Sequence, residues 1–501
     1  MPHTIAVLQV PEIRVRSLND RDVQDGDFVV HWMVAFRRPR WNFALQHSAA
    51  RAQELGKPLV ILEALRLGYP WASDRLHQFI LDGMRAHADY FDAKNVVYLP
   101  YVEPELGAGR GLLAALAERA CLVVSDDYPS FFIPKMHAAA ASKIDPRLEV
   151  VDANGLLPMR AATKVYSRAF DFRRFLQKTL PPHLEHMPLQ DPLKGLAPID
   201  ATVKAGILSH VSAWPLATDD VLAGETLDSM PLDHSVGRVD FEGGFVAGEQ
   251  RMHGFLDGAY PRYGEDRNHP DDGSSSGLSP WLHFGHVSTH HVFHEIAANE
   301  GWSIDRLAAK VNGARHGWWG MSENAEAFLD ELITWREVGF NMCSLNPEYD
   351  RYESLPQWAR DSLEAHESDP RPHLYTLEEL AESKTHDEVW NAAQTELRET
   401  GRMHNYLRML WGKRILEWTP TARDALAAMV ELNNKYAVDG RDPNSYSGIF
   451  WVLGRYDRAW GPERPIFGKI RYMSSANTLK KLRMNDYLAR FGGQATLFDD
   501  A

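Results

Sequence analysis

Five short apolar runs, rich in β-branched residues, alternate with segments of helical periodicity in the first third of the chain. The runs lie at 28–34, 58–64, 96–102, 121–125 and 148–152. Nearly continuous apolar character is typical of strands covered on both faces, and parallel strands need long crossover connections. Segments such as 41–55 and 74–91 are long enough to be crossover helices. Residues 1–180 are therefore predicted to form a doubly wound, Rossmann-like α/β domain with a parallel sheet.

The rest of the chain has a different pattern. Residues 181–249 are rich in Pro, Asp and Gly and are predicted to form an interdomain linker. Beyond residue 250 strand-like alternation almost disappears, and helical periodicity recurs at 290–299, 325–341, 385–400 and 404–418. Eleven of the fifteen Trp residues also lie there. The predicted fold class is therefore α/β plus all-α, with a helical domain at 250–491 and a tail at 492–501.

Composition excludes several classes of protein. The 501 residues exceed the roughly 250–300 residues at which single cores split, so more than one domain is expected. No apolar run approaches the ~20 residues of a membrane helix, and the first residues lack a basic leader. Only Cys121 and Cys343 are present, which argues against a disulfide framework or a cysteine-rich zinc site. We expect a cytoplasmic protein without a membrane segment.

Charge is unevenly distributed. The net charge of −14 argues against indiscriminate binding to polyanions, because affinity for nucleic acid depends largely on neutralising phosphates. Residues 451–490, however, hold nine Lys or Arg and three Asp or Glu, a local net charge of +6. This stretch could form a basic binding face, or it could simply be a solvated surface at the end of a helical domain.

Two local patterns resemble known sites but fail on spacing. The sequence GAGRG at 107–111 lacks one position of the G-x-G-x-x-G fingerprint and does not follow a strand directly. A second group, in HFGHVSTHHVFHE, comprises His283, His286, His290, His291, His294 and Glu295. It lacks the H-E-x-x-H arrangement of zinc proteases. We predict no metal site and expect packing or surface histidines.

A series of uncommon strings runs through the helical part of the chain. They are RYGEDRN, LSPWLHFGHVS, FLDELITWRE, THDEVWNAAQTEL, GRMHNYLRMLW, LNNKYAVDGRDPN and GKIRYMS. Together with RVRSLN at 14–19 and HWM…RxxxNFAL at 31–45, their order and spacing resemble class II cyclobutane pyrimidine dimer photolyases of the photolyase/cryptochrome family. The resemblance covers nearly the whole chain. It implies an N-terminal α/β domain followed by a helical FAD domain, and a monomer that acts on UV-damaged DNA.

The resemblance implies that a serine-rich stretch binds the phosphates of FAD. A small hydroxyl-rich turn, suited to hydrogen bonds with phosphate oxygens, precedes LSPW. The resemblance places the FAD phosphates there, at Ser274, Ser275, Ser276 and Gly277, with Tyr263 and Leu278 alongside. The family often has a Lys and an Asn in this stretch, whereas this chain has Asp271, Asp272 and Gly277.

The resemblance also assigns residues around the flavin ring. Asn433 corresponds to the side chain that faces flavin N5, where an amide can donate or accept without titrating. Arg408 and Asp439 resemble the ion pair over the ring, whose fixed positive charge favours the reduced anionic flavin. Without the neighbouring motifs, this pair would be interpreted as an ordinary buried salt bridge.

Three tryptophans match the electron relay of the family: Trp390, Trp411 and Trp418. Trp411 and Trp418 are seven residues apart, so on one helix they would share a face about 10.5 Å apart along the axis. A tryptophan stripe at this spacing is otherwise typical of a helix core. Leu410 occupies a position where the family can have Tyr, so an accessory tyrosine is not expected there.

The lesion site is implied in the same way. Glu331 and Trp335 are four residues apart and would point from one helix face into a common cavity. The resemblance assigns Glu331 to hydrogen-bonding the dimer and stabilising its radical anion, and Trp335 and Met409 to the apolar lining. Further residues match those that hold the flipped lesion or the DNA around it: Trp451, Trp460, Arg267, Asn268 and Arg471. Stacking aromatics and phosphate-binding arginines suit an extruded base.

The resemblance implies that reduced anionic FAD absorbs blue or near-UV light and passes an electron to the dimer, whose ring then splits before the electron returns. Two alternatives differ in class: a cryptochrome-like photoreceptor without repair activity, and a dark flavin or nicotinamide oxidoreductase. Nothing in residues 28–160 distinguishes a deazaflavin from a folate antenna chromophore, or shows that one is present.

Overall fold

The computed structural model describes residues 9–493, which divide into two compact units. The first unit comprises the chain up to Thr163 together with Thr179–Met252 and Leu278–Asn299. The second comprises Lys164–Lys178, His253–Gly277 and the chain from Glu300 onward. The units are therefore interleaved along the sequence, whereas the predicted domains follow one another at 180 and 250. The predicted domain boundaries stay a prediction. The boundaries of the two compact units lie at other residues.

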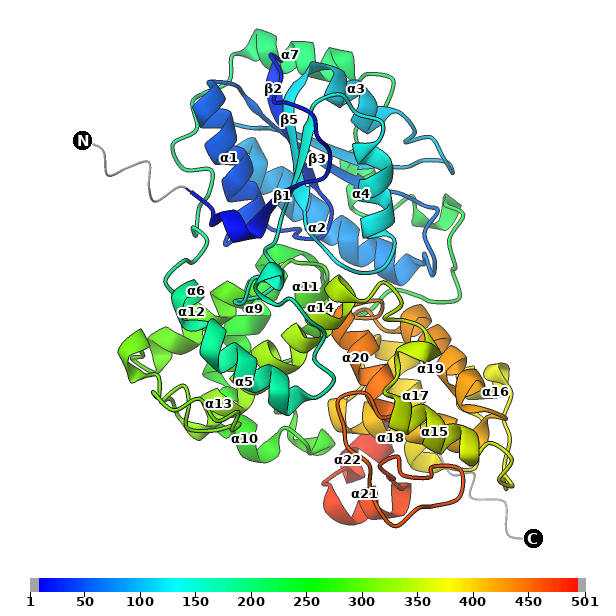
Figure 1. The fold of residues 1–501 in the computed structure, drawn as a ribbon. Coiled ribbons are helices and arrows are strands. Elements are labelled where there is room, and N and C mark those ends of the chain that lie inside the picture. Colours follow the sequence, from blue (N-terminus) through cyan, green and yellow to red (C-terminus); the bar gives the residue numbers. More distant parts are fainter. Residues whose placement is uncertain (1–8, 494–501) are drawn as a thin grey trace. The chain divides into compact units, whose positions relative to one another are not determined.

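A six-stranded sheet forms the centre of the first unit, in the order β1-β6-β5-β2-β3-β4 (Figure 1). Its strands are β1 (Val15–Ser17), β2 (Phe28–Met33), β3 (Leu59–Leu65), β4 (Val97–Val102), β5 (Ala120–Asp126) and β6 (Arg147–Val151). All neighbours are parallel except β1, which pairs antiparallel with β6. Every residue of β2 and β5 is buried, which explains their continuous apolar character.

The helices of this unit connect the strands and follow the sheet. They are α1 (Phe43–Leu55), α2 (Asp74–Asp92), α3 (Leu112–Arg119), α4 (Ile133–Ala141), α6 (Pro181–Leu184), α7 (Ala201–His210), α8 (Asp219–Leu222), α9 (Gly244–Asp257), α11 (Ser279–His283) and α12 (Thr289–Asn299). In Figure 1, α1 lies on one side of the sheet and α3 and α4 on the other. The predicted doubly wound α/β architecture is confirmed. The short edge strand β1 was not predicted, because three partly exposed residues carry no apolar alternation.

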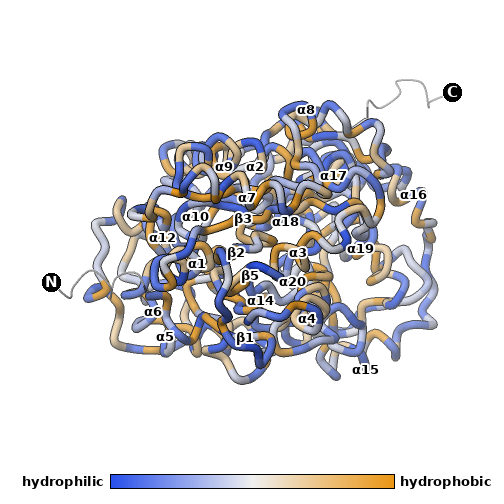
Figure 2. The backbone as a smooth tube through the Cα atoms, turned by 90° about the horizontal axis from the view of Figure 1, so that it is seen from above, coloured by the Kyte–Doolittle hydropathy of each residue, from blue (hydrophilic) through white to orange (hydrophobic). Residues whose placement is uncertain are grey.

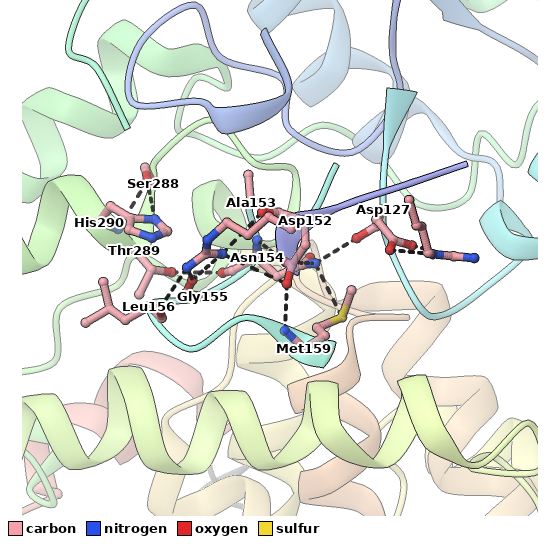
Figure 3. Close-up of polar contacts among 12 residues, drawn as sticks. Asp127, Asp152, Ala153, Asn154, Gly155, Leu156, Met159, Ser288, Thr289 and His290 are labelled. Carbon is pink, nitrogen blue, oxygen red and sulfur yellow. Dashed lines mark hydrogen bonds and ion pairs between the residues drawn. The ribbon is translucent and has the colours of Figure 1, made fainter. Parts of the chain in front are cut away.

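Polar side chains tie down the carboxyl edge of β5 and β6 (Figure 3). The Asp152 carboxylate accepts hydrogen bonds from the backbone N–H of Asn154 at 3.0 Å and of Met159 at 2.6 Å. Asn154 Nδ2 in turn donates to the Asp127 carbonyl at 2.7 Å. Because buried backbone donors need partners, these side chains fix the loop that follows β6.

Asp126 closes the sheet at its topological switch point. Its Oδ2 accepts hydrogen bonds from the backbone N–H groups of Val34, Ala35 and Phe36 at 2.8, 2.7 and 2.9 Å. In open α/β sheets the crevice between such strands, here β2 and β5, is the usual place for a ligand. In this chain the Asp126 carboxylate already accepts from these three backbone N–H groups, so they are not available to an anionic ligand.

The histidine-rich segment packs on aromatic rings within the first unit. Trp41 stacks on His291 with ring centroids 5.1 Å apart, and lies 4.9 Å from the ring of His294. Phe43 meets His290 edge to face at 5.2 Å. These contacts give the histidines a packing role. No group of three or more potential metal ligands occurs in the part of the chain that the structure describes.

The second unit is helical. Its helices are α5 (Ala169–Thr179), α10 (Tyr263–Asp266), α13 (Glu323–Leu329), α14 (Arg336–Leu345), α15 (Gln357–Ala365), α16 (Leu377–Ala381), α17 (Glu388–Thr400), α18 (Asn405–Trp418), α19 (Ala422–Tyr436), α20 (Pro443–Val452), α21 (Ser475–Lys481) and α22 (Asn485–Phe491). Along single helices in Figure 2, orange and blue stretches alternate, as expected where one face packs on a core. Between residues 250 and 493 the described chain contains no named strand, which confirms the predicted helical part.

Close helix packing depends on a small residue at one crossing. A Cβ atom on Gly412 of α18 would come within 2.5 Å of Val452 Cγ2 and 3.0 Å of Met429 Sδ. Glycine therefore lets α18 approach both α20 and α19. Over residues 9–493, no helix combines the length and apolar character required to cross a bilayer.

We predict that Asp126→Ala lowers the free energy of unfolding by about 3 kcal/mol or more, because it leaves three buried N–H groups without an acceptor at about 1–3 kcal/mol each. Urea denaturation followed by circular dichroism measures the loss. The exposed Asp145→Ala is the matched control. Equal stability of the two variants would contradict the role given to Asp126.

Candidate active site

A π-helical turn presents the first predicted lesion residues. The turn η7 (Asp330–Trp335) lies between α13 and α14, where the sequence predicts one continuous helix. Glu331 and Trp335 both keep part of their side chains exposed, while Leu332, Ile333 and Thr334 between them are buried. Such i→i+5 turns recur at functional sites, and the pattern of apolar residues gives no signal for them.

Glu331 is paired with a predicted DNA-binding residue. Arg267 Nη1 donates to Glu331 Oε1 at 2.8 Å, and its guanidinium lies 5.3 Å from the centroid of the Tyr263 ring. Burial raises the pKa of Glu331, and the positive charge of Arg267 offsets this only in part. Burial also raises the pKa of Tyr263 well above its ordinary value, with the Glu331 carboxylate adding to the shift. A carboxyl in this setting accepts a proton more readily than one in water.

A buried ion pair holds the turn in place. Arg173 of α5 donates to both carboxylate oxygens of Asp330, at 2.7 and 3.0 Å, and also to the Gly313 carbonyl at 3.3 Å. The two side chains are only 7% and 8% exposed. Asp330 directly precedes Glu331, so this pair fixes the backbone from which Glu331 projects. Sequence reasoning missed Arg173, which lies 157 residues from its partner.

The basic C-terminal stretch forms an aromatic and cationic cluster. The Arg471 guanidinium lies 4.1 Å from the centroid of the Trp460 ring and 5.3 Å from that of Trp451. Asp457 accepts from Arg471 Nε at 3.0 Å and from Trp460 Nε1 at 3.2 Å. Three of the predicted lesion or DNA residues are thus brought together, and Asp457, which the sequence analysis did not single out, orients two of them.

Lys413 lies behind this cluster and was also missed. Its side chain is 1% exposed, its Nζ donates to the Val452 carbonyl at 2.5 Å, and it lies 5.1 Å from the centroid of the Trp451 ring. Burial lowers the pKa of Lys413 to about 7, with Asp457 opposing the shift. Because Lys413 is buried, it packs against Trp451 from the core side.

Residues predicted to surround the flavin ring lie on α18, α19 and the turn after α19. Arg408 donates to Asp439 through Nη1 at 3.3 Å and Nη2 at 3.1 Å, with both side chains partly exposed. Asn433 is buried and donates to Ser445 Oγ at 2.7 Å. Met409, beside Arg408, is half-buried. The predicted ion pair is therefore formed. Because both side chains are partly exposed, the pair can contact a further group.

The three tryptophans predicted to form the relay are buried. Trp390 Nε1 donates to the Trp411 carbonyl at 3.0 Å, and Trp411 Nε1 donates to Gln394 Oε1 at 2.8 Å. Trp390 and Trp418 meet edge to face with ring centroids 5.5 Å apart. Trp390 of α17 thus contacts both tryptophans of α18, through the ring of Trp418 and through the backbone carbonyl of Trp411, and we call these three residues the aromatic group.

Trp418, the last of the three along the chain, is buried. It is 2% exposed and contacts Tyr375 and His386, with ring centroids at 5.4 and 5.3 Å. Tyr375 is partly exposed and His386 is exposed, and the Tyr375 hydroxyl lies 2.6 Å from His386 Nδ1. The aromatic contacts therefore approach solvent through Tyr375 and His386, which the spacing of tryptophans alone could not show.

The serine-rich loop is compact. Ser274 is 1% exposed and donates to the Asp272 carbonyl at 3.2 Å, while Gly273 and Gly277 have φ of 59° and 64°. Such positive values favour glycine and make the loop turn sharply on either side of the serines. Ser275 is exposed, Ser276 is half-buried and Leu278 is buried. The loop thus presents small side chains and closely spaced backbone.

One contact joins Arg267, a predicted lesion residue, to the start of the helix that carries residues predicted to bind the flavin. His404, directly before α18, lies with Nε2 3.1 Å from the Arg267 carbonyl. Asn268, next in the chain, is half-buried. Arg267 is thereby held by its side chain at Glu331 and by its backbone at the start of the helix that carries Arg408. The second unit thus combines a raised-pKa carboxyl, aromatic stacking surfaces and paired arginines.

Comparison with known proteins assigns the chain to a family. It is 31% identical over 482 residues to a deoxyribodipyrimidine photo-lyase of Methanothermobacter thermautotrophicus, covering 96% of this chain and 98% of that protein. The chain belongs to the deoxyribodipyrimidine photo-lyase family. The photo-lyase of Oryza sativa subsp. japonica is 33% identical, covering 96% of this chain and 91% of the relative. That of Arabidopsis thaliana is also 33% identical, over 92% and 88%.

A solved structure supports the fold of this photo-lyase family member. A bacterial class III photolyase from Agrobacterium tumefaciens matches 93% of this chain and 87% of its own, with a TM-score of 0.63 and 19% identity. No protein-family model matches the chain. The predicted membership of the photolyase family is confirmed.

We predict that Lys413→Met raises the free energy of unfolding, relative to that of the wild type, by more at pH 6 than at pH 9. An unfolded lysine has a pKa near 10.5, whereas that of Lys413 is about 7, so between these values the unfolded chain binds more protons and the wild type gains stability as pH rises. Below pH 7 the wild type bears the full cost of a buried charge.

Urea denaturation at the two pH values measures the difference between Lys413→Met and wild type, with the exposed Lys480→Met as control. A difference that is the same at both pH values would show that the lysine is not a buried titrating group.

Proposed function

We propose that this protein repairs cyclobutane pyrimidine dimers in UV-damaged DNA in a light-driven reaction. The observation that carries the proposal is the similarity to deoxyribodipyrimidine photo-lyases along almost the full length of both chains. Two partly exposed groups in the second unit support it: Glu331 with Arg267, and Arg471 with Trp451 and Trp460, because a flipped lesion needs a polar group, stacking surfaces and cations.

FAD is the proposed cofactor of the second unit, and its residues suit this group. The sharp turns at Gly273 and Gly277 allow close backbone approach to the phosphates at Ser274, Ser275 and Ser276, with Tyr263 and Leu278 beside them. Arg408, Asp439 and Asn433 are proposed to hold the ring, since a cation favours an anionic reduced flavin. When bound in its reduced anionic form, FAD supplies on excitation the electron that splits the dimer.

Glu331 is proposed to hydrogen-bond the lesion and to stabilise its radical anion. Because burial raises its pKa, the carboxyl takes up a proton more readily than a carboxyl in water, and when protonated its O–H can hydrogen-bond a carbonyl oxygen of the lesion on which negative charge develops. Arg267 fixes its position at 2.8 Å and adds positive charge. The electron that enters the lesion returns at the end, so the residues need only bind and orient the lesion and hydrogen-bond it.

The remaining predicted lesion residues are proposed to hold the extruded dimer. Trp451 and Trp460 offer stacking faces, Trp335 and Met409 an apolar lining, and Asn268 and Arg471 contacts to base or phosphate. Arg471 is already oriented by Asp457 at 3.0 Å, so it need not lose much conformational freedom on binding.

Finer points of the proposal concern the type of photolyase. We assign the protein to the class II branch on its motifs, and expect it to act as a cytoplasmic monomer. The two buried free cysteines, Cys121 and Cys343, are typical of a reducing compartment. An antenna chromophore of deazaflavin or folate type in the first unit is not part of this proposal.

The deciding experiment mixes purified, chemically reduced protein with a UV-irradiated oligonucleotide and measures the loss of dimers in blue light and in darkness. Light-dependent loss supports repair. Loss in neither condition would contradict the proposal, and photoreduction of the flavin in a separate oxidised sample would then favour a photoreceptor.

We predict that Glu331→Ala lowers the repair yield per photon several-fold while affinity for damaged DNA changes less. A hydrogen bond to a charged group contributes about 1.5–3 kcal/mol, and here it acts on the radical state of the lesion rather than on the bound ground state. Laser-flash repair yields and fluorescence-polarisation binding separate the two effects. Glu323→Ala, an exposed glutamate on α13, should behave as wild type.

We predict that Trp390→Phe abolishes or strongly slows photoreduction of the oxidised enzyme but leaves repair nearly intact when the flavin is chemically reduced beforehand. Phe preserves the packing at a cost near 1 kcal/mol but is much harder to oxidise. Trp411→Phe and the buried Trp418→Phe should have similar effects.

Absorbance of the flavin under blue light with a thiol donor measures photoreduction. Trp318→Phe removes an equally buried tryptophan outside this aromatic group and is the control. Wild-type photoreduction in all three relay variants would mean that these residues only pack.

A further inference from the structure

The serine-rich loop is held by a segment far along the chain. Arg483 Nε donates to Asp272 at 3.0 and 3.2 Å, and its Nη2 donates to Asp266 at 2.9 Å and also to Asp272. Its backbone N–H donates to His269 Nδ1 at 3.1 Å, and its carbonyl accepts from the Asp271 N–H at 3.3 Å. One residue thus makes side-chain and backbone bonds to the stretch that leads into Ser274.

Asp271 returns the contact by capping α22. The helix has no capping side chain of its own at Met484. Instead, Asp271 accepts from the N–H of Tyr487 at 2.8 Å and of Asp486 at 3.3 Å. A carboxylate at a helix N-terminus satisfies free N–H groups and meets the positive end of the helix dipole. The partners are 216 residues apart in sequence, so this cap joins two distant segments.

The other side of α22 is anchored in the helical core. Tyr487 is 7% exposed, and its hydroxyl donates to Glu396 of α17 at 2.8 Å. The same Glu396 oxygen accepts from the N–H of His404, directly before α18. The segment 483–491 therefore connects the loop to the helices that carry Trp390 and Arg408.

We propose that the segment 483–491 is a clasp that holds the loop 269–274 in the shape needed to retain the flavin phosphates, with Arg483 and Asp271 as positioning residues. This inference rests on the proposed function of the serine loop. It explains the departure from the family pattern at Asp271 and Asp272, which here serve as attachment points for Arg483 and α22.

Charge supports the same conclusion. Three carboxylates, those of Asp266, Asp271 and Asp272, lie beside a loop proposed to receive a pyrophosphate, which they would repel. Arg483 forms ion pairs with two of them, Asp266 and Asp272, and the N-terminus of α22 meets the third. Hydrogen bonding from Arg483 lowers the pKa of Asp272, so the carboxylate stays ionised and paired. Opening the clasp would both loosen the loop and expose its negative charge.

The test measures release of FAD from the flavin-loaded protein by the recovery of flavin fluorescence. Arg483→Glu should speed release about tenfold, because it replaces the ion pairs with Asp266 and Asp272 by repulsion between carboxylates. Adding Asp272→Arg to Arg483→Glu should recover part of the loss, because Asp266 still repels the new glutamate. Arg490→Glu reverses an exposed charge on the same helix and should release FAD at the wild-type rate.

Hydrogen exchange of the backbone amides at 269–274 is measured in parallel on the same variants. Faster exchange in Arg483→Glu, partly reversed in the double variant, supports the clasp. Release and exchange equal to those of Arg490→Glu would overturn it, as would faster release that the second substitution does not reverse. If the wild type binds no FAD, the proposed cofactor site fails, and the exchange data alone decide whether the clasp exists.

Discussion

The buried ion pair of Arg173 and Asp330 is the interaction on which the candidate active site depends. Removing one member of such a pair costs about 3–5 kcal/mol, because the other charge is left without a partner in a medium of low dielectric constant. The pair fixes the π turn, and the π turn keeps Glu331 and Trp335 partly exposed while their neighbours are buried. The site is thus built on a segment, α5, that precedes the main helical part of the chain.

The three arginines of the candidate site are paired in the same way. Arg267, Arg408 and Arg471 each bind a carboxylate, of Glu331, Asp439 and Asp457 respectively. Pairing holds each guanidinium in a defined orientation before any ligand arrives, and it keeps the local charge balanced in a protein whose net charge is −14. One of these arginines, Arg471, also lies beside the rings of Trp451 and Trp460.

The sequence predicted the sheet well because strands covered on both faces must be apolar along their whole length, and the five parallel strands lie within a residue or two of the predicted runs. It also identified the Arg408–Asp439 pair through its motif. It could not show the π turn, which has no apolar period of its own. Nor could it show Lys413 behind Trp451 or the burial of Trp418, because these depend on which helix faces meet in space.

Interleaving of the two units has a consequence for synthesis of the chain on the ribosome. The second unit needs Lys164–Lys178, His253–Gly277 and residues from Glu300 onward, so its early segments emerge long before their partners. Asp330 follows Arg173 by 157 residues, and Tyr487 follows Asp271 by 216. At about 5–20 residues per second, the serine loop waits roughly ten seconds or more for α22. During that interval Asp271 and Asp272 lack their partners in α22 and at Arg483, so the clasp between the loop and the segment 483–491 can form only when synthesis of the helical unit is nearly complete.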